Sequence, residues 1–126
     1  MGARGPRPVV LDAGALIALD RADRRLVRLL EFADEVHVPA GALAQAWRAP
    51  ARQVRLVRAV SSDSVEIHPL TERDARAAGA LCGATGTSDV IDASVVLVAR
   101  RTGGVTVTSD SGDLRRIDPQ LALIAC

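Results

Sequence analysis

The sequence predicts an α/β fold, a three-layer α/β/α sandwich in which helices cover both faces of a mainly parallel central sheet. Short β-branched runs alternate with helical stretches along the chain, which is the pattern of a parallel sheet. Hydrophobic residues make up 48% of the 126 residues, enough to form the core of one domain. Because no linker, repeat or low-complexity tract divides the chain, we expect a single domain over residues 1–126.

Local patterns place the elements in order. We expect strands where β-branched residues cluster beside proline or glycine, at residues 8–11, 35–38, 65–67, 105–108 and 121–124. We expect helices at residues 13–19, from 22 or 23, at 41–47, at 52–60, from 71, at 89–101 and at 112–116. The second of these helices has an apolar stripe formed by Leu26, Leu29, Leu30 and Phe32. Pro50 should break the chain between two of these helices. A loop is expected at residues 83–88, and the glycine pair at 103–104 should end the most apolar helix.

Charge and cysteine content narrow the class of protein. The formal net charge of +1 gives no bulk field that would draw the whole chain to nucleic acid or membrane. Cys82 and Cys126 lie far apart, so we expect free thiols in a reducing cytosol rather than a disulfide scaffold. Asp12 interrupts the apolar run that follows the arginines at positions 4 and 7, which argues against a signal peptide. No segment is long enough to span a bilayer, so we expect a cytoplasmic protein without a membrane partner.

Aspartates recur where the expected strands and helices begin or end. Asp12 and Asp110 each follow a strand, and in a parallel sheet ligands bind beyond the carboxyl ends of the strands. Asp89 and Asp92 lie three residues apart, so a helix places them on one face. Asp12 and Asp89 could instead cap the helices that follow them. Asp92 is harder to explain as a structural residue, because a charge inside an apolar helix needs a partner.

A second acidic pair and two hydroxyls follow the fourth expected strand. Asp113 repeats the three-residue spacing after Asp110, and one of the two could cap a short helix. Thr108 and Ser109 add hydroxyls that could bind a metal, a water or a backbone group. Carboxylates packed together repel, so such a cluster persists at neutral pH chiefly by holding a cation. An all-oxygen site favours Mg²⁺ or Mn²⁺, which can activate water for attack on a phosphodiester.

The basic residues are all arginines, and four of them lie in a stretch without acids, from residue 36 to residue 62. Their spacing of four, three and three predicts one shared helix face, formed by Arg48, Arg52, Arg55 and Arg58. A solvated charged face would explain the pattern. The functional interpretation is a stripe beside the acidic site that binds the phosphates of RNA or DNA.

Four segments stand in an order and spacing that resemble those of a known family. They are residues 9–13 (Val-Val-Leu-Asp-Ala), 38–45 (Val-Pro-Ala-Gly-Ala-Leu-Ala-Gln), 88–93 (Ser-Asp-Val-Ile-Asp-Ala) and 107–114 (Val-Thr-Ser-Asp-Ser-Gly-Asp-Leu). The family is the PIN domain, named after the PilT N-terminus, whose bacterial members are largely VapC-type toxins of toxin–antitoxin pairs. The resemblance implies a PIN-like α/β/α domain with Mg²⁺- or Mn²⁺-dependent ribonuclease activity. It also implies a homodimer and a cognate antitoxin that covers the active site.

The resemblance assigns roles to individual residues. Asp12, Asp92 and Asp110 would be catalytic metal ligands, with Asp113 as a further acid of the metal site. Asp89 would support them or add a ligand. The chain departs from the family at Gln45, where a glutamate is usual.

The glutamine at position 45 opens an alternative function. Its amide oxygen can still reach a metal or a bound water, but it contributes no charge and cannot act as a general base. The leading expectation is a metal-dependent endoribonuclease, the toxin of a type II toxin–antitoxin pair. The alternative is a catalytically weakened PIN-fold module that binds RNA or protein.

Two other chemistries find less support. His37 and His68 have no Cys or His partner at ligand spacing along the chain, so we expect no zinc site. A phosphotransfer protein with Asp12 as nucleophile is a further alternative. Haloacid-dehalogenase relatives carry a second aspartate where this chain has Gly14, and receiver domains need a lysine, which this chain lacks.

Overall fold

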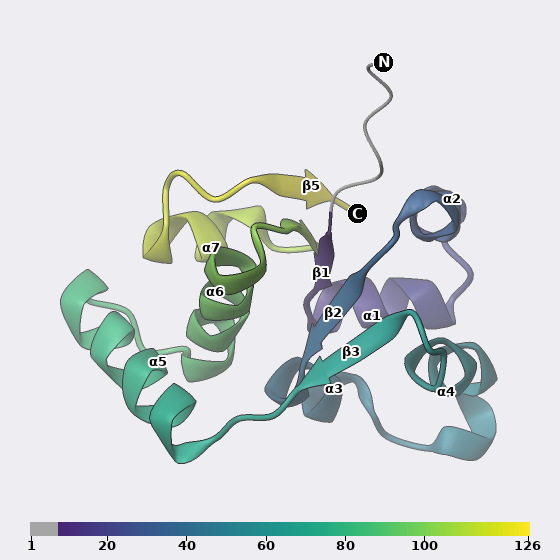
Figure 1. Cartoon of the computed structure of the whole chain (residues 1–126), viewed down its shortest axis with the longest axis horizontal. Coiled ribbons are helices and arrows are strands. Elements are labelled where there is room, and N and C mark those ends of the chain that lie inside the picture. The colour runs from purple at the N-terminus through teal and green to yellow at the C-terminus, as the bar shows by residue number, and fades with distance from the viewer. Residues whose placement is uncertain (1–7) are drawn as a thin grey trace.

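A five-stranded sheet with all strands parallel forms the centre of the computed structural model, which describes residues 8–126 (Figure 1). The arginines at positions 4 and 7 lie outside the described residues. The strands are β1 (Val9–Leu11), β2 (Val36–Pro39), β3 (Val65–His68), β4 (Val105–Thr108) and β5 (Leu123–Ala125). Their spatial order is β3-β2-β1-β4-β5. The predicted sheet is therefore confirmed.

The strand order creates a switch point at the centre of the sheet. The chain moves outward from β1 through β2 to β3 and then returns to the other side of β1 with β4. Val10 consequently pairs with His37 on one side and with Thr106 on the other. In open parallel sheets, ligands bind beyond the carboxyl ends of the strands at such a point. Asp12 directly follows β1 there, and Thr108 ends β4.

Helices cover both faces of the sheet, as predicted. The helices are α1 (Ala13–Asp20), α2 (Arg24–Phe32), α3 (Ala40–Ala46), α4 (Val54–Val60), α5 (Glu72–Thr85), α6 (Val90–Thr102) and α7 (Ser111–Ile117), with a short 3₁₀ turn, η1 (Pro50–Arg52). Helix α6 packs on β1, β2 and β4, with α5 and α7 beside it, and α1 packs on the other face with α2 and α4 beside it (Figure 1). Helix α3 contacts both α1 and α6.

Apolar side chains explain why these elements pack together. All three residues of β1 are buried because it is the central strand of the sheet, and six residues of α6 are buried because this helix packs against the sheet and against α3, α5 and α7. Helix α2 presents Leu26 to this core, but Phe32 is 63% exposed. The predicted apolar stripe of α2 is therefore wrong at Phe32, which lies on the solvent side of the last turn.

Several predicted boundaries also need correction. Helix α5 continues through Gly83 to Thr85, so the predicted loop at 83–88 begins three residues later. The helix ends at Gly86, whose φ of 69° is a left-handed conformation that glycine adopts without strain. Arg52 belongs to η1, and α4 begins at Val54. The last strand starts at Leu123 rather than at Leu121, which is buried before the strand.

Among residues 8–126, no single helix is long and apolar enough to cross a membrane. In this part of the chain, only α5 and α6 taken together are long and apolar enough, and these two helices are bent by 105° with respect to each other.

Candidate functional site

Asp12 stands at the switch point of the sheet, buried at the start of α1. Its backbone is extended, and its carboxylate oxygen Oδ1 accepts a hydrogen bond from the Ala15 N–H at 2.9 Å. The predicted helix cap is therefore present. The cap uses Oδ1, and the carboxylate still has lone pairs for further partners.

The loop after β4 packs closely against the start of α1. A Cβ atom added at Gly14 would lie 1.9 Å from the Ser109 Oγ, so only glycine permits this approach. The Thr108 hydroxyl accepts a hydrogen bond from the Asp110 N–H at 2.8 Å. The same hydroxyl hydrogen-bonds to the Asp12 carboxylate. Thr108 thus connects the acid after β1 with the acid after β4, a supporting role that its hydroxyl suggested.

Asp89 and Asp92 come from the first turn of α6. The Asp89 Oδ1 caps the helix by accepting hydrogen bonds from the N–H groups of Ile91 and Asp92, at 3.0 and 2.9 Å. Asp92 is half-buried, and burial is the main reason why its pKa is raised to about 6. The other causes are the charges of four further carboxylates, namely Asp89, Asp113, Asp12 and Asp110. The structure therefore brings all five predicted aspartates close enough to act on one side chain.

Two other carboxylates in this acidic cluster also hold protons more tightly than usual. Burial raises the pKa of Asp12, and Asp110 raises it further, while hydrogen bonds from Thr108 and Ala15 partly offset these effects. The pKa of Asp113 is raised mainly by its hydrogen bond with Asp110 and by the charge of that residue. Carboxylates crowded beyond the carboxyl ends of the strands thus ionise less readily when no positive charge lies nearby.

A hollow of about 380 Å³ opens beside the acidic cluster. It is lined by Gly86, Thr87, Ser88, Asp89, Asp92, Asp113, Arg116 and Ile117. Arg116 was not anticipated from the sequence, although it follows Asp113 by one helical turn and pairs with it at 3.6 Å. Its guanidinium is 75% exposed, so it can bind a phosphate without losing a buried partner.

The donor chemistry of the acidic cluster suits a hard divalent cation. Every candidate ligand is an oxygen atom, the type that Mg²⁺ and Mn²⁺ prefer. The five aspartate carboxylates do not form one tight group. Among residues 8–126, the single set of three or more His, Cys, Asp or Glu ligand atoms that all lie within 4.8 Å of one another is elsewhere, at His37, Glu66 and His68. The acidic cluster thus has suitable ligands at wider separation.

The fold brings together the two histidines, which have no partner at ligand spacing along the chain. They lie on neighbouring strands, with His37 Nδ1 and His68 Nε2 2.8 Å apart. The contact comes from the pairing of β2 with β3 and not from spacing along the chain.

Gln45 lies exposed on the last turn of α3. It follows Gly41 by four residues, so the two share a helix face. A Cβ atom at Gly41 would lie 2.5 Å from Ile91 Cδ1, which shows that this face of α3 approaches the first turn of α6. Gln45 is therefore on the side of α3 that faces the helix carrying Asp92.

The predicted arginine stripe does not form a single helix face, because Pro50 ends the preceding segment and starts η1. Arg48 follows α3, and its Nη1 donates hydrogen bonds to the carbonyls of Ala44 and Trp47. Arg52 lies in η1. Arg55 and Arg58 are exposed on α4, which contacts the edge strand β3, whereas α7 with Arg116 contacts the opposite edge strand β5 (Figure 1).

Comparison with known proteins gives one family and several solved structures. The model of the PIN domain family matches residues 9–119. The fold is similar to VapBC2 from Rickettsia felis bound to a promoter DNA fragment, with a TM-score of 0.69 and 17% identity over 94% of this chain and 98% of that chain.

Two further structures share this fold. The Mycobacterium tuberculosis VapC20 toxin, described as cleaving the sarcin–ricin loop, has a TM-score of 0.69 and 16% identity over 90% of this chain and 96% of that one. FitAcB from Neisseria gonorrhoeae has a TM-score of 0.63 and 16% identity over 92% of this chain and 96% of that one. No curated protein sequence matches the chain.

Proposed function

Because this chain belongs to the PIN domain family, we propose that it is an endoribonuclease that hydrolyses RNA phosphodiester bonds with Mg²⁺ or Mn²⁺. The observation that carries the proposal is the setting of Asp92, where partial burial and then the charges of four further carboxylates raise its pKa to about 6. Such crowding is costly for folding unless a cation or a reaction makes use of it.

The metal would be held by Asp12, Asp92 and Asp110, with Asp113 beside them and Asp89 in support. A bound Mg²⁺ or Mn²⁺ supplies charge neutralisation and a water of lowered pKa. The protein's own contribution is positioning. Thr108 fixes Asp12 and Asp110 relative to each other through its hydroxyl.

Arg116 is the residue best placed to hold the RNA backbone near these acids. It lines the hollow beside Asp92, and it is kept there by its pairing with Asp113. A guanidinium binds phosphate oxygens through two parallel hydrogen bonds. Arg55 and Arg58 remain candidates for contacts with more distant phosphates, and with Arg48 and Arg52 they give the region before β3 a positive charge.

The biological setting that we propose is the toxin of a type II toxin–antitoxin pair, acting as a homodimer in the cytoplasm. Support comes from solved structures of this fold, two of which are described as VapBC2 bound to promoter DNA and as FitAB bound to DNA. A cognate antitoxin is therefore the partner to seek.

The nuclease proposal is tested by incubating the purified chain with RNA in the presence of Mg²⁺ or Mn²⁺. We expect cleavage that EDTA stops and that Asp12→Asn and Asp92→Asn each reduce at least ~100-fold, the scale of losing a charged group that stabilises the transition state. Glu72→Gln is the matched control, because Glu72 is an exposed acid whose ion pair within residues 8–126 is with Arg76. Cleavage that survives EDTA, or that Asp12→Asn leaves unchanged, would show that another nuclease or mechanism is responsible.

Gln45 supports the second candidate function, a PIN-fold module that binds RNA or protein without cutting. Gln45→Glu separates the two proposals, because it adds a carboxylate on the α3 face that approaches α6. If the wild-type chain cleaves RNA, we expect the substitution to strengthen metal binding and activity. If the wild-type chain binds RNA without cleaving it, Asp92→Asn leaves binding intact, and Gln45→Glu creates activity from none, then the binding module is the correct function.

A further inference from the structure

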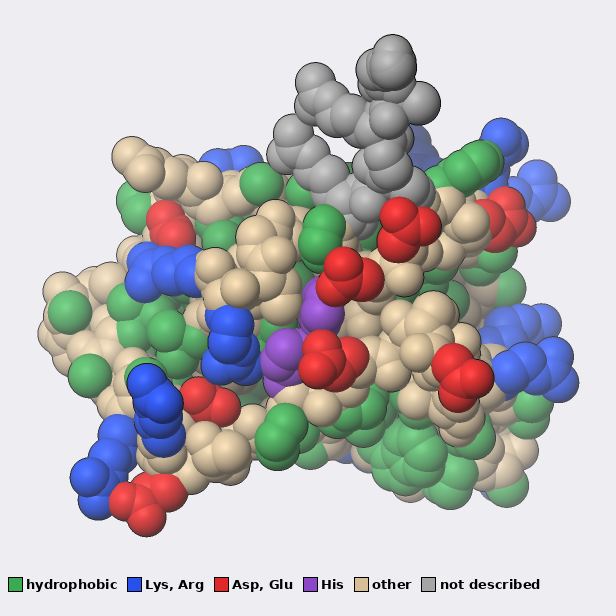
Figure 2. All heavy atoms as spheres, in the orientation of Figure 1, with side chains coloured by type: hydrophobic (Ala, Val, Ile, Leu, Met, Phe, Trp, Pro, Cys, Tyr) green, Lys and Arg blue, Asp and Glu red, His purple; other side chains and the backbone are tan. Residues whose placement is uncertain are grey.

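The strands β2 and β3 bring together two copies of one short pattern, a glutamate, an aliphatic residue and a histidine. The pattern occurs at residues 35–37 and again at residues 66–68. Parallel pairing sets His37 opposite Glu66, and the two-residue period of a strand puts His68 on the same face as Glu66. Figure 2 shows the two histidines side by side at the surface, with acidic side chains next to them.

Three atoms able to bind a metal form a small triangle at this place. His37 Nδ1 lies 2.8 Å from His68 Nε2 and 3.2 Å from Glu66 Oε2, and the distance from His68 Nε2 to Glu66 Oε2 is 3.3 Å. In a tetrahedral zinc site with bonds of about 2.0–2.1 Å, neighbouring ligand atoms are roughly 3.3 Å apart. The triangle therefore has nearly the size of one face of a zinc tetrahedron.

Hydrogen bonding alone leaves this triangle incompletely satisfied. Arg101 Nη2 donates to His68 Nδ1 at 3.0 Å, so the proton of the neutral His68 ring is on Nε2 and points to His37 Nδ1. In a neutral His37 ring whose Nε2 donates to Glu35 Oε1 at 3.2 Å, Nδ1 carries only a lone pair. Glu66 Oε2 then faces that lone pair at 3.2 Å without a proton between them.

We propose that His37, Glu66 and His68 bind Zn²⁺ or a similar borderline divalent cation, with water as the fourth ligand. Two imidazoles and one carboxylate are a donor set that zinc accepts when it keeps one open position. The His37 and His68 side chains are only 6% and 11% exposed, which holds the rings in place, while Glu66 is 65% exposed and opens the site to solvent.

The proposed zinc site is separate from the acidic cluster and does not depend on the proposed nuclease function. Arg101, beside His68, follows Asp92 on α6 by nine residues, which corresponds to about 14 Å along the helix. Nitrogen ligands also distinguish the two, because imidazole suits zinc whereas Mg²⁺ takes oxygen. A bound ion would join the edge strand β3 to β2.

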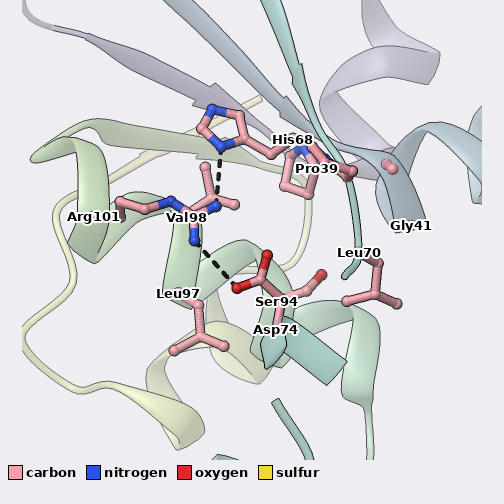
Figure 3. A pocket seen from close by; sticks show the side chains of 11 residues that line it. Pro39, Gly41, His68, Leu70, Asp74, Ser94, Leu97, Val98 and Arg101 are labelled. Atoms are coloured by element: carbon pink, nitrogen blue, oxygen red, sulfur yellow. Dashed lines mark hydrogen bonds and ion pairs between the residues drawn. The ribbon is translucent and has the colours of Figure 1, made fainter. Parts of the chain in front are cut away.

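Glu35 and Arg101, which lie beside the triangle, have opposite effects on metal binding. Glu35 accepts the Nε2 proton of His37, as carboxylates do behind metal-bound histidines. Arg101 opposes binding, because a His68 ring bound through Nε2 must carry its proton on Nδ1, where the guanidinium also presents a proton. Figure 3 shows Arg101 between His68 and Asp74, which it reaches at 3.4 Å. Arg101 must therefore turn toward Asp74 when the ion binds.

The test is calorimetric titration of untagged, chelator-stripped protein with Zn²⁺ alone, with Co²⁺ absorption to report four-coordinate geometry. We expect one tight Zn²⁺ site per chain besides weaker uptake by the acidic cluster, with His68→Ala and Glu66→Gln each weakening the tight binding at least ~tenfold. Arg101→Gln should tighten it roughly tenfold, the scale at which groups behind metal ligands act. If the three side chains form only a structural hydrogen-bond network, Arg101→Gln should not tighten Zn²⁺ binding.

Two control variants make the outcome decisive. Glu72→Gln removes an exposed acid outside both sites and should leave the Zn²⁺ affinity unchanged. Asp92→Asn weakens the acidic cluster and should also leave it unchanged. The proposal is overturned if no zinc binds, if Glu66→Gln and His68→Ala bind as the wild type does, or if only Asp92→Asn reduces binding. Circular dichroism checks that each variant is folded, and Glu66→Gln and Glu72→Gln change only exposed side chains.

Discussion

The Asp92 side chain combines two unfavourable surroundings, partial burial and four neighbouring carboxylates, and both favour its protonated form. The folded chain therefore holds this proton more tightly than the unfolded chain does. Stability from this linkage is fully present below the ordinary pKa of an aspartate and is lost as pH rises through about 6. Above that pH the ionised carboxylate costs folding free energy.

Replacing Asp92 by asparagine should stabilise the metal-free protein at pH 8. We expect a gain of about 1–2 kcal/mol, because each pKa unit corresponds to roughly 1.4 kcal/mol and partial exposure screens some of it. Urea unfolding in EDTA at pH 8 and at pH 4 measures the effect. The gain should be small at pH 4, where Asp92 is protonated, and a gain of equal size at both pH values would attribute it to something other than charge.

Single residues also show what the sequence alone could and could not predict. Asp92 was identified because an acid inside an apolar helix needs an explanation, and the structure gives it an unusual pKa. The contact between His37 and His68 could not be found from spacing, because it depends on which residues of β2 and β3 face each other. The position of Gln45 relative to Asp92 likewise depends on how α3 packs against α6, which a residue pattern does not give.

At the scale of elements, helix α4 depends on a residue from another helix. Gln53 precedes α4 but its side chain does not cap it. Instead the Asp20 carboxylate, at the end of α1, accepts a hydrogen bond at 3.1 Å from the N–H of Leu56 in the first turn of α4. The Leu56 side chain is fully buried, so this bond helps fix the helix on the core.

Asp20→Ala should therefore destabilise the protein by about 1–2 kcal/mol, the usual cost of losing a helix cap. Asp20→Asn should lose less, because its amide oxygen can still accept the bond. Denaturant unfolding of both variants gives the comparison. Equal losses in the two variants would mean that charge near the helix start matters more than the hydrogen bond.

The elements that were predicted well are those with a strong local signal. The bounds of β4 match the prediction, since a β-branched run stands between a glycine pair and a polar turn. The end of α5 was missed because Gly83 resembles a stop signal but is tolerated in a helix that has Gly86 beyond it. The arginine stripe failed because the proline at position 50 divides the segment into two elements.

For the whole molecule, the proposed metal site in the acidic cluster would link folding to metal binding. A ligand that binds only the folded state stabilises it by about 2.7 kcal/mol at a concentration of 100 times its Kd. Mg²⁺ should therefore raise the Tm of the wild-type protein, and Asp92→Asn should remove most of this increase. Mg²⁺ is the ion to use, because it prefers oxygen ligands and should not bind the imidazoles of His37 and His68. An equal rise in Tm for both proteins would assign the effect to general screening of charge.

The position of β1 in the sheet has a consequence for synthesis on the ribosome. Its neighbours β2 and β4 come from early and late parts of the chain, so Val10 gains one partner long before the other. A nascent chain that stops before β4 can pair only the first three of the five strands, and it holds Asp12 without Asp110. The proposed metal site is therefore completed among the last steps of translation, and a truncated chain would lack one of its carboxylates.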